Sequence, residues 1–343
     1  MRRTLEQRLI DDLRFSLSNQ GEESSRVERD AARLVIHGVR QTAASALTCS
    51  RVFGVAYAAP AFLVHASMKE VTRILVNLAL EGLSEGGSFA IRAHRSTPGK
   101  LSRREVELSG GTEVLRALSD RGGRVDLDQP DLTLYVDLVG DWAYVYKEKM
   151  EGPGGLPLSS QWKMLAVLDS GPLSVLAACA MMRRGCVVEL LIPTSSTIEH
   201  LESATQLALA ERVARLVTRP NYKAFVLEVD GQNGASVRWR GFIRAAAVKF
   251  AREKRFKGVI FGDISGDLSS LSGGHLKSTQ VPVFYPLLGL EEEDLAELSR
   301  LVAMDERELL SQARLEVRTR DSEDKVKAQI EDLQIPVVRE IQL

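Results

Sequence analysis

The stretch KMLAVLDSGPLSVLAACAMMRRG, from Lys163 to Gly185, decides the fold of the second half of this 343-residue chain. An apolar run, MLAVL, precedes a tight turn at Ser170, Gly171 and Pro172, and an apolar helix pattern then runs to Gly185. This order predicts a buried strand, a loop and the N-terminus of a helix. Backbone N–H groups and the positive end of the helix dipole would meet at that loop, which suits a phosphate group. Such units are common in α/β domains, so the loop alone does not identify a nucleotide site.

Beyond this stretch, predicted strands and helices alternate along the chain. The strand-like runs are VVELLIP, KAFVLEV, GVIFGD and VPVFYPL, and helices are expected over 174–184, 198–217 and 236–255. This β-α-β order predicts a parallel sheet with helices on both faces and a ligand site at the carboxyl ends of the strands. That edge would collect Asp169 to Ser174, Pro193 to Ser196 and Gly262 to Gly266. An acidic helix near 290–302 and a strand-like segment, IPVVREI, follow.

The sequence of the first half of the chain predicts a mixed α+β unit. Helices are expected over 4–19, 42–49, 71–80 and 102–119, and strands over 32–39, 52–64, 89–95, 132–138 and 142–147. The last two strands alternate with period two around a short turn, which is typical of a hairpin. Ser67 and Glu70 have the spacing of a capping box, and Pro60 predicts a sheet edge. The linker is expected at GPGGLPLSS, residues 152–160.

Composition and charge limit the function classes. Apolar residues make up 44% and charged residues 27% of the chain, as in globular proteins, and no apolar run is long enough to span a bilayer. The charged N-terminus lacks the apolar core of a signal peptide, so a cytoplasmic protein is expected. The net charge is -1, and any RNA affinity must therefore come from local basic patches. Cys49, Cys179 and Cys186 form no close pair and the five histidines are scattered, so no zinc or iron–sulfur site is indicated.

Two groups of basic residues are candidates for such patches. The first lies in and after the strand FAIRAHR and comprises Arg92, Arg95, Lys100, Arg103 and Arg104. The second is a pair one turn apart on the predicted helix over 236–255, Arg240 and Arg244, near the ligand edge of the sheet. A solvated surface is the alternative interpretation for the first group.

Several separated segments together resemble one family. They are RVFGVAYAAPAF, FAIRAHR with LSRREVE, RVDLDQPDLTLYVDLVGDWAYVY, GPGGLPL, the strand-loop-helix ending in MMRRG, RGFIRAAAVKFAREK, GVIFGDISGDLSS and VPVFYPLLGLEEEDLAEL. In this order they resemble the tRNA 4-thiouridine synthetases of the ThiI type, over residues 4–310. The resemblance implies an α+β ferredoxin-like and THUMP module followed by a Rossmann-like PP-loop ATP-pyrophosphatase domain. Domains are expected at 1–58, 59–151 and 152–343. The first strand of the ferredoxin-like domain and a rhodanese domain are expected to be missing.

The family resemblance also implies ligands and site residues. The partner would be tRNA, and the chain would bind it as a homodimer. No membrane partner is expected. The cofactor would be ATP with Mg²⁺. The expected ATP-binding residues are Val167, Leu168, Ser170, Gly171, Ser174, Arg240 and Gly262. The expected RNA-binding residues are Arg92, Arg95, Lys100, Arg103, Arg104 and Arg244. The family's THUMP domain places such cations on phosphates of the acceptor stem, where shape rather than base identity is read.

The PP-loop departs from the family pattern. The family sequence is Ser-Gly-Gly-x-Asp-Ser, whereas this chain has Asp169-Ser170-Gly171-Pro172-Leu173-Ser174, so the loop is degenerate. Leu173 replaces a carboxylate, and Asp169 places a negative charge where phosphates should approach. Two like charges about 4 Å apart repel by roughly 4 kcal/mol at an effective dielectric near 20. Weak or absent ATP binding is therefore expected unless Mg²⁺ or a lysine intervenes.

The sulfur chemistry and the function stay open at this point. Family enzymes activate the uridine by adenylation and use a cysteine C-terminal to these motifs, but no cysteine follows Cys186. A donor protein or free sulfide would then supply the sulfur, and no catalytic residue can be named. Three hypotheses remain: an ATP-dependent tRNA sulfurtransferase, a catalytically inactive tRNA-binding protein, and a PP-loop domain repurposed for another RNA modification.

Overall fold

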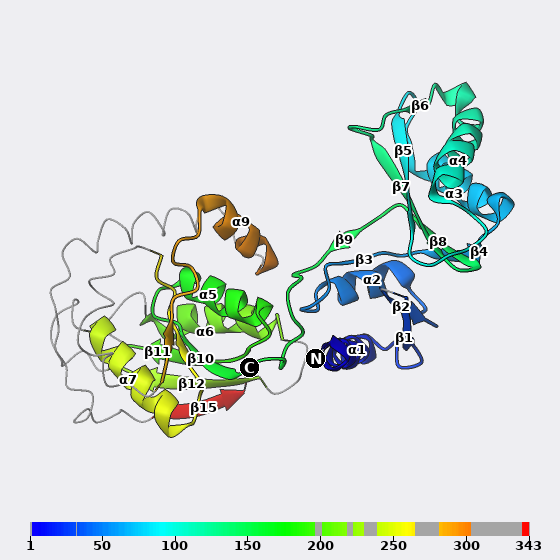
Figure 1. The fold of residues 1–343 in the computed structure, drawn as a ribbon. Coiled ribbons are helices and arrows are strands. Elements are labelled where there is room, and N and C mark those ends of the chain that lie inside the picture. Colours follow the sequence, from blue (N-terminus) through cyan, green and yellow to red (C-terminus); the bar gives the residue numbers. More distant parts are fainter. Residues whose placement is uncertain are drawn as a thin grey trace. The chain divides into compact units, whose positions relative to one another are not determined.

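The computed structural model describes residues 2–31, 33–195, 201–217, 222–229, 239–264, 281–302 and 338–342 (Figure 1). The chain divides into two compact units. Unit 1 comprises Met1–Ser16, Arg51–Ala56 and Gly152–Leu343, and unit 2 comprises Leu17–Ser50 and Tyr57–Glu151. None of the described helices is both long and apolar enough to span a bilayer.

Unit 2 is built on a five-stranded sheet with the order β4-β8-β7-β5-β6. Its strands are β4 (Phe62–His65), β5 (Ser88–Arg95), β6 (Arg124–Val125), β7 (Leu132–Val139) and β8 (Trp142–Tyr146). The predicted hairpin is confirmed, because β7 and β8 pair antiparallel. Helices α3 (Met68–Gly82) and α4 (Arg103–Ala117) supply apolar side chains to one core with the sheet, including Leu75, Val106 and Val136.

Side-chain caps define where these helices begin. Ser67 caps α3, and its hydroxyl accepts a hydrogen bond from the Glu70 amide, as the spacing predicted. The complete reciprocal box forms at α4, where Ser102 accepts from the Glu105 amide and the Glu105 carboxylate accepts from the Ser102 amide. Hydrogen bonding of the Glu105 carboxylate to the side chain and backbone of Ser102 lowers the pKa of Glu105. Each cap satisfies backbone donors that the first helical turn leaves unpaired.

Shorter elements complete unit 2. The hairpin of β1 (Arg26–Asp30) and β2 (Arg33–His37) precedes α2 (Thr42–Ser50), and η1 (Ser119–Arg121) follows α4. The single strand expected over 52–64 is wrong. Within that range lie β3 (Tyr57–Ala58), which pairs with β9 (Met150–Glu151), and then β4, on either side of Pro60. Because proline has no N–H to donate, the ladder is interrupted there.

Unit 1 contains a six-stranded sheet with the order β14-β13-β10-β11-β12-β15. Its strands are β10 (Lys163–Val167), β11 (Val187–Thr194), β12 (Lys223–Glu228), β13 (Val259–Ile260), β14 (Val283–Phe284) and β15 (Val338–Gln342). All neighbours are parallel except β15, which pairs antiparallel with β12. The chain first builds outward from β10 to β12 and then returns to the other side of β10. The strand order therefore reverses between β10 and β13, which is where such sheets bind ligands.

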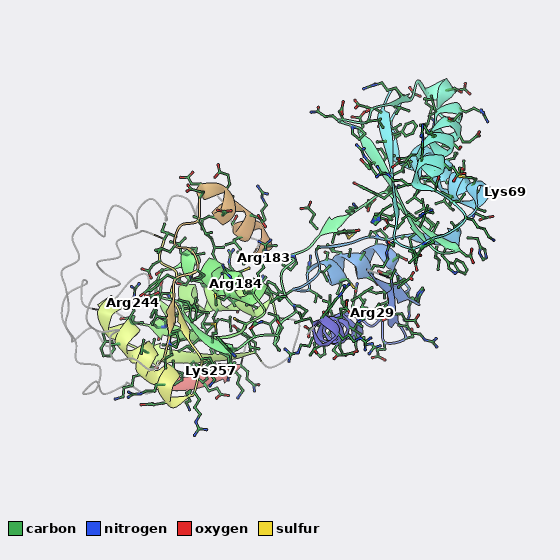
Figure 2. All side chains as sticks on the ribbon, in the orientation of Figure 1. Arg29, Lys69, Arg183, Arg184, Arg244 and Lys257 are labelled. Carbon is green, nitrogen blue, oxygen red and sulfur yellow. The ribbon has the colours of Figure 1, made fainter. Side chains whose placement is uncertain are left out.

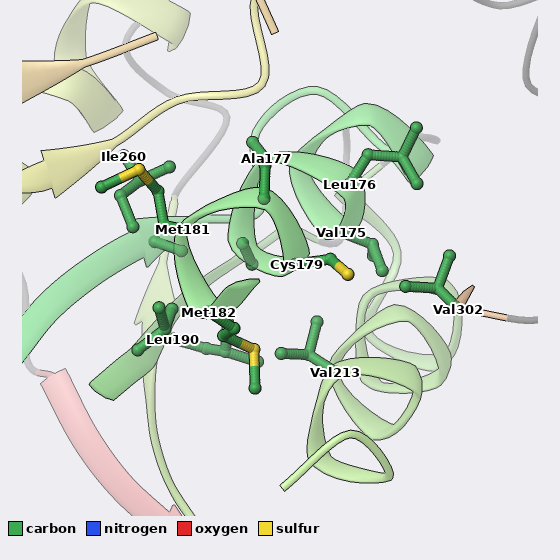
Figure 3. Close-up of a cluster of buried hydrophobic side chains, with 14 of the residues drawn as sticks. Val175, Leu176, Ala177, Cys179, Met181, Met182, Leu190, Val213, Ile260 and Val302 are labelled. Atoms are coloured by element: carbon green, nitrogen blue, oxygen red, sulfur yellow. The ribbon is translucent and has the colours of Figure 1, made fainter. Parts of the chain in front are cut away.

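Helices cover both faces of this sheet, as the sequence predicted. The helices that the structure describes in unit 1 are α5 (Pro172–Arg183), α6 (Ser203–Ala214), α7 (Trp239–Glu253) and α9 (Glu292–Leu301), with most of α1 (Arg2–Asn19). One face packs with α5, α6 and α9, and Figure 3 shows Val175 and Met182 of α5 among Leu190, Val213 and Val302. The other face packs with α7 through residues such as Ile243. These two apolar layers hold the carboxyl ends of β10 and β13 side by side.

Candidate functional site

The loop between β10 and α5 takes its shape from two residues that match the family pattern. Gly171 has a φ of 55°, in the left-handed region that residues with a side chain rarely adopt. Ser174 lies in the first turn of α5, and its hydroxyl accepts a hydrogen bond of 2.9 Å from the Ser170 amide. Pro172 begins the helix, a position that suits its fixed φ but removes one N–H donor. The loop therefore keeps its turn although three of its six residues differ in type from the family.

A second glycine allows the close approach of β13 to this loop. A Cβ atom added at Gly262 would lie 2.6 Å from the Ser174 nitrogen and 2.7 Å from the Leu173 carbonyl carbon. Real Cβ contacts are not this short, so any larger residue would push α5 away from β13. Gly262 consequently brings the ends of two neighbouring strands into one site.

An ion triad lies at the switch point. Arg244 of α7 donates from Nε to Oδ2 of Asp169 at 3.0 Å, and from Nη2 to the two oxygens of Asp263 at 2.9 and 3.0 Å. Asp169 follows β10 and Asp263 follows β13, and their side chains are 0% and 3% exposed. The guanidinium carbon also stands 4.9 Å from the centroid of the Phe261 ring. One arginine thus ties α7 to the carboxyl ends of both central strands.

The sequence analysis expected the negative charge of Asp169 to oppose phosphates, and the structure shows that this charge is paired with an arginine. Arg244 meets that charge, and the Ser170 hydroxyl donates to the same carboxylate at 3.1 Å. The repulsion between Asp169 and a phosphate is therefore weaker than the value calculated for an isolated carboxylate, because the ion pair with Arg244 offsets much of it.

Leu173 and Tyr285 complete the surroundings of the loop. Leu173 is fully buried in the apolar cluster of α5, so the position of the family's carboxylate packs against hydrocarbon here. Tyr285 directly follows β14, and its ring centroid lies 6.0 Å from that of Phe261. Burial raises the pKa of the Tyr285 phenol, while Arg244 lowers that pKa and Asp169 raises it. The sequence analysis placed Asp263 at the ligand edge only as part of the range Gly262 to Gly266, and it named neither Phe261 nor Tyr285, although both lie in the quoted strand segments.

Most of the residues expected to hold ATP gather here. Val167 and Leu168 are fully buried at the end of β10, and Ser170 and Ser174 are 5% and 1% exposed. The side chain of Arg240, the expected Ser196 and residues 265–266 lie outside the described residues. Figure 2 labels Arg244 on α7, where this residue forms the triad. A contact between Arg244 and RNA remains a prediction.

The structure separates the cations expected to bind RNA in unit 2. Arg92 lies on the sheet face opposite the helices, because Ile91 and Ala93 face the core, and its guanidinium donates to the Leu127 carbonyl. The other four residues lie at the end of β5, in the loop after it and at the start of α4: Arg95, Lys100, Arg103 and Arg104. The basic group is therefore concentrated at one end of the sheet.

The cations at this end differ in their partners. Arg103 pairs with Glu107 at 2.9 Å, and Lys100 lies 3.9 Å from an Asp141 oxygen. Arg95 and Arg104 are exposed and make no ion pair with any residue that the structure describes. Lys69, which Figure 2 labels, is also exposed in the first turn of α3 and makes no ion pair within the described ranges. These three cations are available to an anionic ligand.

The thiols are unsuited to nucleophilic work in this conformation. All three cysteines of the sequence are buried. Burial raises the pKa of Cys49 and of Cys179 to about 12, and it also raises the pKa of Cys186. Because the thiolate is the reactive form, none of them is poised to carry sulfur. Among the described residues, no group of three or more His, Cys, Asp or Glu side chains is arranged to hold a metal ion.

Two family models match this chain. A model described as THUMP domain matches residues 65–148, within unit 2. A model described as Thiamine biosynthesis protein (ThiI) matches residues 159–334, which is more than half of the chain. The second match includes the β10–α5 loop and the ion triad.

Two curated relatives are similar over most of the chain. The probable tRNA sulfurtransferase of Aeropyrum pernix is 32% identical over 323 residues, covering 88% of this chain and 79% of that protein. The tRNA sulfurtransferase of Pyrobaculum aerophilum is 30% identical over 292 residues, covering 79% of this chain and 57% of that protein. The chain therefore spans little more than half the length of the Pyrobaculum relative.

Two solved structures share the fold. A Pyrococcus horikoshii protein is 23% identical with a TM-score of 0.65, and the match covers 89% of this chain and 96% of that one. A 4-thiouridine synthetase in complex with RNA and ATP is 19% identical with a TM-score of 0.68, and the match covers 88% and 80% of the two chains. The predicted fold class, an α+β THUMP module followed by a parallel-sheet PP-loop domain, is confirmed.

Proposed function

This chain belongs to the ThiI family, and on that premise we propose that it binds tRNA and replaces a uridine oxygen with sulfur, forming 4-thiouridine. The observation that carries the proposal is the construction of the switch point, where Gly171, Ser174 and Gly262 give the β10–α5 loop its shape. A degenerate loop without a ligand would not require the tight approach at Gly262. The same tRNA substrate implies a cytoplasmic location.

The residues present fit a nucleotide phosphate better than the sequence suggested. The loop lies at the N-terminus of α5, where the helix dipole favours an anion, and Arg244 reduces the negative charge of the two carboxylates. We assign Ser170, Gly171 and Ser174 to the phosphates of ATP, with Val167, Leu168 and Gly262 lining the same edge. ATP would supply the energy that activates the uridine oxygen for replacement.

Unit 2 would hold the RNA in this proposal. Arg95, Lys100, Arg103 and Arg104 lie where one stretch of phosphates can meet them, and Arg92 lies apart on the other face of the sheet. Phosphate contacts of this kind give affinity and salt dependence. Because the three thiols are buried and protonated, the sulfur would come from free sulfide or from a donor protein.

The test is a product assay with two binding measurements. The purified chain receives tRNA, Mg·ATP and sodium sulfide, and 4-thiouridine is measured by mass spectrometry of the digested tRNA. We expect the product with all three components and none without ATP. Arg103→Ala with Arg104→Ala should weaken tRNA binding and reduce its salt dependence by about two counterions. Lys254→Ala with Arg255→Ala, two exposed residues in the turn that follows the C-terminus of α7, provide the matched control.

Each outcome decides between the hypotheses. If tRNA binds but Mg·ATP does not, and no 4-thiouridine forms, the sulfurtransferase proposal is wrong and the chain is an RNA-binding relative of the enzyme. If the control pair reduces the salt dependence as much as the test pair, the assignment of RNA to the α4 end of unit 2 is wrong.

A further inference from the structure

The face of the unit 2 sheet that lies opposite α3 and α4 carries a row of aromatic rings. Ala143 and Val145 of β8 belong to the helix-side core, so the alternate residues Trp142, Tyr144 and Tyr146 project from the other face. His65 of β4 and Tyr135 of β7 extend the row, because they stand opposite Trp142 and Tyr146 in the ladders. Aromatic rings on an open sheet face are a common means of stacking on RNA bases.

Most rings of this row already contact other side chains of unit 2. The Tyr144 hydroxyl donates to Asp30 at 2.6 Å, and the Arg33 guanidinium lies 5.6 Å from the Tyr144 centroid. The Tyr146 hydroxyl donates to Asp137 at 3.1 Å, and its ring stacks on Tyr135 with centroids 5.1 Å apart. The Lys149 ammonium covers Tyr135 at 3.9 Å. These three tyrosines have partners within the fold.

The pair at the end of the row is exposed. His65 and Trp142 are stacked with their centroids 4.3 Å apart and their planes inclined by 21°. His65 is exposed, and Trp142 keeps 44% of its surface exposed. The pairing of β4 with β8 places His65 directly opposite Trp142, so the two rings lie together before any ligand arrives. A large apolar surface held in this way is expected where a flat ligand stacks, since preorganisation reduces the entropy lost on binding.

Two exposed cations lie near this pair along the chain or beside its neighbour Asp141. The Ala66 amide donates to the Asp141 carbonyl at 2.8 Å, which joins the residues next to His65 and Trp142. Lys69 lies in the first turn of α3, shortly after His65 in the chain, and Lys100 lies 3.9 Å from an oxygen of Asp141, the residue before Trp142. Flat rings flanked by exposed cations match the requirements of a single-stranded nucleic acid, whose bases stack while its phosphates meet the positive charges.

We propose that the His65–Trp142 pair is a stacking platform for an unpaired nucleobase of RNA, with Lys69 and Lys100 contacting the adjacent phosphates. The proposal rests on the proposed function, because it assigns part of the RNA that unit 2 holds to specific side chains. The platform reads an unpaired base rather than a duplex, since a paired and stacked base has no free face for the rings.

Trp142 provides its own reporter. The full chain and a Trp142→Phe variant are titrated with a short single-stranded RNA and with a blunt RNA duplex, and the difference between their tryptophan fluorescence isolates Trp142. We expect the single-stranded RNA to quench this difference signal and the duplex to leave it unchanged. Trp142→Ala should weaken single-stranded RNA binding roughly 5- to 150-fold, the range for loss of a base-stacking aromatic, and Trp142→Phe should weaken it less.

Trp162→Ala is the matched control. Trp162 is 64% exposed, lies in unit 1 just before β10, and has no role in the proposal. Thermal unfolding of each variant shows whether the fold is retained. If the RNA affinities of Trp142→Ala and Trp162→Ala both equal that of the unaltered chain, or if saturating RNA leaves the Trp142 signal unchanged, the platform is wrong and tRNA binding by unit 2 still stands. If the unaltered chain binds neither RNA nor tRNA, both proposals fall.

Discussion

The switch point of unit 1 and the α4 end of unit 2 both concentrate charge, but they do so in opposite ways. At the switch point, Arg244 pairs with Asp169 at 3.0 Å and with Asp263 at 2.9 Å, and all three side chains are largely buried. At the α4 end, Arg95 and Arg104 are exposed and have no ion pair with any residue in the described ranges. Buried charges are expensive to separate, whereas exposed ones contribute little to stability. The packing of unit 1 therefore accounts for the first group, whereas no ion pair within the described residues accounts for Arg95 and Arg104 in the second.

Removing the central arginine should have the largest effect. Arg244→Met would leave two buried carboxylates without their cation, so we expect the free energy of unfolding of unit 1 to fall by about 3–5 kcal/mol. Urea denaturation followed by circular dichroism measures this change. Arg104→Met is the control in unit 2 and should change the free energy of unfolding by no more than about 0.5 kcal/mol.

The outcome tests the comparison directly. Equal stabilities for the two methionine variants would mean that the triad is as well solvated as the surface cations, and the distinction between the two regions would be lost. A further change, Asp169→Asn in the Arg244→Met background, should recover part of the lost stability because it removes one of the unpaired charges.

A smaller effect is expected from a pair of glycines, one in each region. Gly262→Ala places a methyl group 2.6 Å from the Ser174 nitrogen, so we expect a loss of about 1–3 kcal/mol from overpacking, together with weaker Mg·ATP binding. Gly111 lies within α4 with open space around its added Cβ, and Gly111→Ala should stabilise the helix by about 0.5–1 kcal/mol. Thermal unfolding and calorimetry with Mg·ATP measure both changes. Opposite signs are expected, and a stabilised Gly262→Ala variant would contradict the close approach.

The smallest effect concerns the thiols, of which Cys49 lies in unit 2 and Cys179 in unit 1. Burial raises the pKa of each from 9.0 to about 12, so the folded state holds the proton more tightly than the unfolded state does. The stability linked to these protons is fully present below about pH 9 and is lost as the pH rises from about 9 to about 12. At pH 8, iodoacetamide should therefore label neither thiol in the native chain.

Repeating the iodoacetamide labelling at increasing urea concentrations compares the stability of the two units. Mass spectrometry of the alkylated peptides reports which cysteine becomes reactive first, and hence which unit opens at the lower urea concentration. Rapid labelling of Cys179 without urea would contradict its burial in the core beneath α5.

Local patterns in the sequence predicted the elements that frame the site. The apolar run before Asp169, the Gly171–Pro172 turn and the alternation in 132–138 and 142–147 all appear as β10, the α5 start and the β7–β8 hairpin. The error over 52–64 arose because an apolar run was extended through Pro60, where the ladder is interrupted. The family resemblance added the domain order, and the expected boundaries of those domains remain predictions.

The sequence by itself determined the alternation of strands and helices in unit 1, its parallel sheet and the loop at the carboxyl edge of that sheet, because each depends on residues that are neighbours in the chain. Only the tertiary structure decided which charges meet. Asp169 and Arg244 are separated by 75 positions, and neither residue's local pattern reveals the other. In the same way, strand alternation placed Arg92 away from the basic end of unit 2, and ladder pairing brought His65 onto Trp142. Side chains distant in sequence become partners only when packing has fixed the register and faces of their elements.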